Sequence, residues 1–128
     1  MIDVTLIHII VLLCVHFLAD FILQTRVVAD NKGKDIRYLM LHGAHYTATW
    51  LVFLTPVMIL GFNGLKAYDI LFFGVFNGGL HVMVDFITSK FTSKFYARKN
   101  YSAFFNVIGF DQFIHAATII LTYNWLLI

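Results

Sequence analysis

Residues 81–87 read His81-Val-Met-Val-Asp85-Phe-Ile, which places a histidine and an aspartate four residues apart inside an apolar run. Residues 16–22 are a near copy with the same spacing, His16-Phe-Leu-Ala-Asp20-Phe-Ile. On a helix, this spacing puts both side chains on one face, one turn apart. Ionisable groups in apolar surroundings cost several kcal/mol unless they are paired or ligated. The repeated pair therefore predicts two apolar helices that each carry a functional His–Asp pair.

The composition of the whole chain is that of a membrane protein. Of its 128 residues, 60% are hydrophobic and only 12% are charged, with a mean hydropathy of +0.81. Soluble domains are about half apolar and a quarter charged. The length corresponds to one domain, so we expect a single all-α, polytopic membrane domain over residues 1–128. The net charge of +2 and the lack of a recognisable nucleic-acid module argue against a nucleic-acid partner.

Four apolar segments are long enough to cross a bilayer, which takes about 20 residues per helix. They are residues 4–24, 38–60, 68–89 and 107–128. Between the last two, residues 90–106 mix basic and aromatic side chains. We expect this loop to lie on the inner leaflet as an interfacial helix, or to be an ordinary, partly ordered loop.

The basic residues predict how these helices are oriented. Eight of the nine Lys and Arg residues lie in the first and third connections, and only Lys66 lies elsewhere. The positive-inside rule then places both basic connections in the cytoplasm and both termini outside. Because His-x-x-x-Asp-Phe-Ile recurs in the first and third helices, we expect two repeated hairpins in the same orientation.

With this topology, five of the six histidines and three aspartates fall at one depth, in the cytoplasmic half of the membrane. The candidate metal ligands are His16, Asp20, His42, His45, His81, Asp85, Asp111 and His115. Imidazole and carboxylate together suit zinc, manganese or iron. Eight candidates exceed the four ligands of one tetrahedral zinc. We therefore expect one or two divalent ions, with zinc favoured, and His42-x-x-His45 is a workable chelate.

The same residues suggest roles in a hydrolytic reaction. The candidates for acid–base catalysis are Asp20, Asp85, Asp111 and His115. Side chains placed to orient the ligands are Gln24, Gln112 and Ser89. Basic side chains at the depth of a phosphate headgroup are Lys32, Arg37 and Lys90, although anchoring at the membrane surface explains them equally well. Because the site would open toward the inner leaflet, the sequence favours a metal-dependent hydrolase of a lipid-like or lipid-linked phosphate or ester.

Three other interpretations use the same residues. A proton or metal-ion carrier would use them as a relay, but it needs a polar route through the outer half of the bundle. A di-iron membrane oxygenase uses histidine boxes, generally with more histidines than this chain has. Intramembrane His–Asp pairs are also found as structural hydrogen bonds, worth about 1 kcal/mol per contact. Gly78-Gly79 is a possible helix contact within one chain or within a homo-oligomer.

The spaced motifs resemble a known family. The pattern His16-x-x-x-Asp20-x-x-x-Gln24, His42-x-x-His45, His81-x-x-x-Asp85 and Asp111-Gln112-x-x-His115 is similar to the domain of unknown function 3307 and covers nearly the whole chain. The resemblance implies a small multi-pass protein of the bacterial inner membrane and brings no established chemistry. More distantly, the architecture is similar to membrane-bound metal-dependent hydrolases, which favours the hydrolase modestly.

Overall fold

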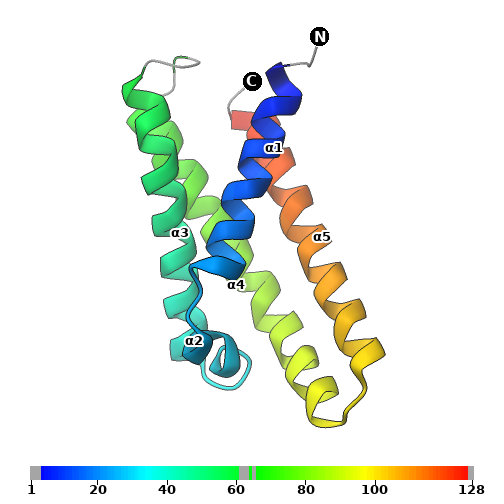
Figure 1. The fold of residues 1–128 in the computed structure, drawn as a ribbon. Coiled ribbons are helices and arrows are strands. Elements are labelled where there is room, and N and C mark those ends of the chain that lie inside the picture. Colours follow the sequence, from blue (N-terminus) through cyan, green and yellow to red (C-terminus); the bar gives the residue numbers. More distant parts are fainter. Residues whose placement is uncertain (1–3, 61–63, 65, 127–128) are drawn as a thin grey trace.

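The structure is a computed structural model that describes residues 4–60, 64 and 66–126. Within these residues the protein is all-α, without a strand. The elements in order are α1 (Val4–Phe17), the π-helical turn η1 (Leu18–Ile22), α2 (Arg26–Asn31), α3 (Ile36–Ile59), α4 (Ala67–Ala97) and α5 (Tyr101–Leu126). In Figure 1 the long helices are α1, α3, α4 and α5, and the short α2 lies against the beginning of α3.

Three stretches are long and apolar enough to cross a membrane: Thr5–Ile22, Ala67–Ala97 and Tyr101–Trp125. This is consistent with a membrane protein. Helix α3 has 24 residues, about 36 Å at 1.5 Å per residue, which is also the length of a span. It carries two histidines and three threonines and is not among the three stretches that are apolar enough to cross a membrane, so the fourth span stays a prediction.

Helix α4 is the centre of the bundle, because it packs along both α3 and α5, while α1 contacts α3 and α5. The beginning of α1 and the end of α5 lie at one end of the bundle, and α2 and the α4–α5 turn lie at the other (Figure 1). The aromatic core includes Trp50 and Phe73, whose rings meet edge-on at 5.1 Å. Large apolar side chains such as Leu121 face outward, as expected on a surface in contact with lipid.

Most of segment 90–106, expected as a separate interfacial helix or a partly ordered loop, belongs to the two long helices α4 and α5. Helix α4 continues to Ala97 and α5 begins at Tyr101, so only a three-residue turn separates them. The helix continues because residues 90–97 contain no glycine or proline. The turn closes at Lys99, whose φ of 56° is left-handed, the conformation that commonly ends helices. Residues 127–128 of the fourth expected span lie outside the described residues.

A wide helical turn connects α1 to the polar segment that follows. The Leu23 N–H donates to the Leu18 carbonyl at 2.8 Å, five residues back, as in a π-helix. One extra residue in this turn changes the register of the side chains around Asp20 relative to a regular α-helix. The i, i+4 geometry expected for His16 and Asp20 is therefore lost, whereas it is kept for His81 and Asp85 in α4.

The two adjacent glycines of α4 differ in what surrounds them. A Cβ on Gly78 would collide with Thr47 Oγ1 and lie 3.7 Å from the Gly43 carbonyl oxygen, so α3 approaches α4 closely here. A Cβ on Gly79 would meet no atom of another described element within 4 Å.

We expect Gly78→Val to lower the free energy of unfolding by about 1–3 kcal/mol through overpacking. Gly79→Val changes helix propensity in the same way without the collision, and serves as the matched control. Thermal unfolding in detergent, followed by circular dichroism, measures both. Equal midpoints for the two variants would show that the close approach of α3 and α4 is not needed.

Candidate metal centre

Four buried side chains from three elements converge at the middle of the bundle and form the four-donor group. They are Asp20 of η1, His42 of α3, and His81 and Asp85 of α4. The Nε2 atoms of His42 and His81 lie 2.8 Å apart. His42 Nε2 lies 3.0 Å from Asp20 Oδ1 and 3.4 Å from Asp85 Oδ2. His81 Nε2 lies 3.5 and 3.6 Å from the same two oxygens.

These spacings fit a metal ion. Ligands about 2.0–2.1 Å from a tetrahedral zinc lie roughly 3.4 Å from one another, and the five distances range from 2.8 to 3.6 Å. His42 Nε2 faces two carboxylates and a second imidazole nitrogen, yet it carries at most one proton with which to satisfy them. A cation at the common point of these lone pairs would satisfy all of them. The donor set of two imidazoles and two carboxylates is therefore compatible with a divalent metal.

A second set, the three-donor group, adjoins the first and consists of Asp20, Asp111 and His115. His115 Nε2 lies 3.3 Å from Asp111 Oδ2 and 3.2 Å from Asp85 Oδ1. Asp20 is a member of both groups, and Asp85 contacts both. The six residues thus form one continuous buried cluster.

Two neutral side chains fix the carboxylates of this cluster. The Gln112 amide donates to Asp20 Oδ2 at 2.7 Å and to Asp111 Oδ2 at 3.1 Å. The Thr88 hydroxyl donates to Asp111 Oδ1 at 2.6 Å. Hydrogen bonds of this kind orient ligating carboxylates, so the structure agrees with the orienting position expected for Gln112.

Lys32, the residue that follows α2, extends into the same cluster. Its ammonium lies 2.7 Å from Asp85 Oδ2, 3.4 Å from His42 Nε2 and 3.9 Å from Asp20 Oδ1. Burial alone would lower the pKa of Lys32, but the Asp85 and Asp20 carboxylates outweigh it and hold the pKa above its ordinary value. The positive charge of Lys32 therefore balances part of the negative charge of the cluster. Its ammonium lies deeper in the bundle than the headgroup position expected from the sequence.

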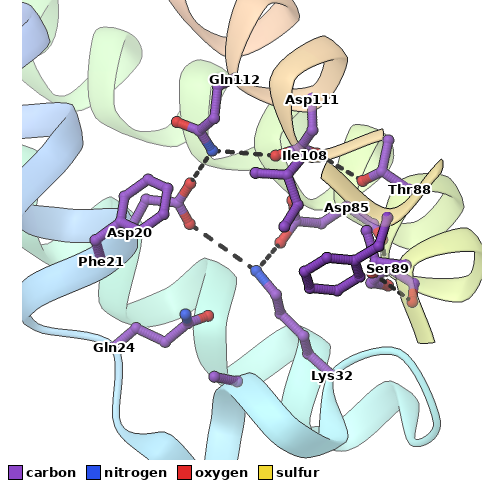
Figure 2. Close-up of a pocket in the computed structure, with 13 residues that line it drawn as sticks. Asp20, Phe21, Gln24, Lys32, Asp85, Thr88, Ser89, Ile108, Asp111 and Gln112 are labelled. Atoms are coloured by element: carbon purple, nitrogen blue, oxygen red, sulfur yellow. Dashed lines mark hydrogen bonds and ion pairs between the residues drawn. The ribbon is translucent and has the colours of Figure 1, made fainter. Parts of the chain in front are cut away.

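The three carboxylates of the cluster, Asp20, Asp85 and Asp111, line a cavity of about 200 Å³ between η1, α2, α4 and α5. Figure 2 shows the carboxylates of Asp20, Asp85 and Asp111 and the ammonium of Lys32 around a common space. Gln24 lies on the wall near Lys32 (Figure 2), and its Oε1 is buried without a partner among the described residues. The remaining lining mixes hydroxyls with apolar side chains: Ser89, Thr92, Phe21, Phe104 and Ile108.

Of the eight ligands expected from the sequence, the structure brings six together: Asp20, His42, His81, Asp85, Asp111 and His115. His16 is buried but belongs to neither group. Its Nδ1 lies 2.9 Å from the Tyr46 hydroxyl, and its Nε2 lies 2.9 Å from Gln112 Oε1. Because η1 changes the register after His16, this histidine contacts the glutamine that orients Asp20 and does not join Asp20 itself.

His45 is exposed to the outside of the bundle and borders a different, apolar surface depression. The expected chelate between His42 and His45 therefore does not form. Two positions three residues apart on a helix differ by about 60° in direction, and here only His42 faces inward. Tyr46, one turn after His42, occupies the inward position and stacks on His81 at 3.9 Å between ring centroids.

The other expected basic residues lie away from the cavity. Arg37 is exposed and pairs with Asp35 at 2.8 Å. The Lys90 ammonium lies 3.5 Å from the ring centroid of Phe86. Ser89 does line the cavity, and its hydroxyl donates to the Asp85 carbonyl. Tyr46 and Thr88 were not expected, although each lies on the same helix face as an expected ligand three or four residues before it.

Comparison with known proteins gives one result. Residues 8–128 match the family described as protein of unknown function (DUF3307). No curated protein and no solved structure matches the chain, so the more distant similarity to membrane-bound metal-dependent hydrolases stays a prediction. Since the match spans nearly the whole chain and includes every residue of the buried His/Asp cluster, the protein belongs to the DUF3307 family.

Proposed function

We propose that this protein is a metal-dependent hydrolase of a lipid-like or lipid-linked phosphate or ester in the bacterial inner membrane. The observation that carries the proposal is the four-donor group, in which buried imidazoles and carboxylates lie at tetrahedral spacing and the two carboxylates, Asp20 and Asp85, border a cavity. Perturbed ionisable groups that share a cavity are the usual mark of a functional site. A purely structural cluster would have no need of a cavity beside it.

The proposed roles follow from the contacts. His42, His81, Asp20 and Asp85 would hold a divalent ion, zinc by preference. Such an ion supplies Lewis-acid polarisation of a phosphoryl or carbonyl oxygen. His115 Nε2 lies between carboxylate oxygens of Asp85 and Asp111, so a proton accepted there is stabilised by both. In a centre with one ion, we assign His115 as the general base that accepts a proton from the attacking water, and Asp111 as the residue that orients it.

The lipid nature of the substrate rests on the membrane setting. We propose four spans, with α3 as the fourth, and basic connections on the cytoplasmic side. In that topology the end of the bundle that carries α2 and the α4–α5 turn faces the cytoplasm (Figure 1). The cavity then opens near the inner leaflet, where its apolar residues Phe21, Phe104 and Ile108 contact acyl or prenyl chains and its polar residues contact a headgroup.

The first test is metal content, measured by elemental mass spectrometry on protein purified in detergent after equilibration with zinc or manganese. We expect stoichiometric metal in the wild type and less than about a tenth of it in His42→Ala, because a ligand is lost. His45→Ala is the matched control: it removes an exposed histidine from the same helix and should keep all of the metal.

Hydrolysis is then measured as phosphate release from phosphatidic acid and from a polyprenyl diphosphate, and as cleavage of a short-chain ester. Wild type without metal after reconstitution would refute the proposal. Iron with oxygen-dependent chemistry would indicate an oxygenase. Metal-dependent ion flux into liposomes, without hydrolysis, would indicate a carrier.

A further inference from the structure

The side chains of the three-donor group could bind a second metal ion themselves, in addition to orienting the ligands of the first. Asp20, Asp111 and His115 each offer one donor atom, and these atoms lie within 4.8 Å of one another. All three residues are at most 9% exposed. Two carboxylates and one imidazole from two different elements are a ligand set that manganese, iron and zinc accept.

The orientation of the shared carboxylates connects the two groups. Asp85 presents Oδ2 to His42 and His81, and Oδ1 to His115 at 3.2 Å. Asp20 likewise presents Oδ1 to His42 at 3.0 Å, while its Oδ2 faces the Gln112 amide, which also contacts Asp111. Each carboxylate therefore has one oxygen on each side. Carboxylates so placed bridge the ions of two-metal sites, which lie about 3.5–4 Å apart.

The charge of the cavity indicates when a second ion would be bound. Three carboxylates and one ammonium line it, so with neutral histidines these groups carry a net charge of −2. One divalent ion brings the total to zero, and a second brings it to +2. A cationic excess in a buried site is costly, but a doubly charged phosphate monoester would cancel it.

We propose that the cluster holds two divalent ions that share Asp20 and Asp85, and that the second ion is held together with a phosphoryl group in the cavity. This inference rests on the proposed metal centre and selects phosphate over ester as its substrate class. When the second ion is bound, His115 is one of its ligands and is no longer the general base. The ammonium of Lys32, on the wall facing the carboxylates (Figure 2), is placed to contact that ligand.

The experiment counts Mn²⁺ ions per chain in the full-length protein in a phosphate-free detergent, with and without millimolar inorganic phosphate. Electron paramagnetic resonance distinguishes a spin-coupled pair from single ions. We expect about one ion without phosphate and two coupled ions with it, because binding of the anion and of the second ion favour each other reciprocally. Asp111→Asn should hold one ion in both conditions, whereas Asp30→Asn, which changes an exposed carboxylate, should behave as wild type.

A milder variant guards against misfolding of Asp111→Asn. Thr88→Val removes the hydroxyl that bonds Asp111 Oδ1 at 2.6 Å and also contacts the Val84 carbonyl oxygen of its own helix at 3.1 Å. It should raise the phosphate concentration that half-fills the second site. A second arm replaces inorganic phosphate with phosphatidic acid in mixed micelles. A response to the lipid alone assigns the phosphoryl group to a headgroup, and a response to the free ion alone assigns it to a soluble phosphate; both support the second ion.

One ion per chain in every condition, unchanged by Asp111→Asn, would overturn the two-ion centre and leave His115 as a proton acceptor between two carboxylates. Two ions whose binding does not respond to either phosphate source would overturn the link to a phosphoryl group. No ion at all would overturn the proposed metal centre as well. Two ions without hydrolysis of any substrate would refute only the proposed hydrolase. Failure of the two-ion centre and failure of the hydrolase therefore give different results.

Discussion

Asp85→Asn is expected to lower the apparent metal affinity by more than about 100-fold and to abolish hydrolysis. Mutation of a residue that merely orients a ligand costs about 10–100-fold, and Asp85 does more. One of its oxygens faces His42 and His81, and the other faces His115. The neutral amide keeps the shape of the side chain but removes its charge and replaces one oxygen donor. Metal titration followed by elemental mass spectrometry measures the change.

The matched control is Asp30→Asn, because Asp30 is an exposed aspartate whose carboxylate lies 3.9 Å from Arg26. We expect it to retain the metal affinity and activity of the wild type. Circular dichroism and size-exclusion profiles establish that Asp85→Asn is folded. A folded Asp85→Asn protein with wild-type metal affinity would contradict the assignment of Asp85 as a ligand.

Lys32→Met is expected to act in opposite directions on the metal-free and metal-bound protein. The ammonium lies 2.7 Å from Asp85 Oδ2, the oxygen that also faces His42 and His81. Removing one partner of a buried ion pair costs about 3–5 kcal/mol, so the metal-free variant should unfold at a lower temperature. A metal ion no longer has to compete with the ammonium, so apparent affinity should rise at least about tenfold, or about 1.4 kcal/mol.

Thermal midpoints with and without metal measure both effects, and the shift on adding metal should be larger in Lys32→Met than in the wild type. Lys34→Met, an exposed lysine of the same connection, controls for the loss of a positive charge and should show neither change. Weaker metal binding in Lys32→Met would mean that Lys32 supports the bound state and does not compete with the ion.

Much of this site could be predicted from the sequence because its polar residues lie within apolar segments. In segments made mostly of Leu, Ile, Val and Phe, each histidine or aspartate is conspicuous, and the spacing of His81 and Asp85 alone places them on one helix face. The family was also predicted, and the match over residues 8–128 confirms it. The all-α class follows from the length and hydropathy of the same segments.

The remaining features depend on information that side-chain periodicity does not contain. No pattern in residues 18–22 predicts a π-helical turn. The sequence therefore does not show that Asp20 joins the buried cluster while His16 belongs to neither donor group. A spacing of three leaves open whether His42 or His45 faces inward, and the packing of α3 on α4 decides it. Lys32 was placed near the surface, because a sequence does not show how far a long side chain extends back into a buried cluster.

The wide turn at Leu18–Ile22 makes the two sides of the metal centre chemically different. Two identical His–Asp segments would build a site with the same chemistry on both flanks, and a bound molecule could enter it in either of two directions. Here one flank offers paired imidazoles from α3 and α4, whereas the flank near His16 offers the amide of Gln112. A ligand with unlike ends, such as a charged head and an apolar tail, would therefore have a single preferred direction of entry.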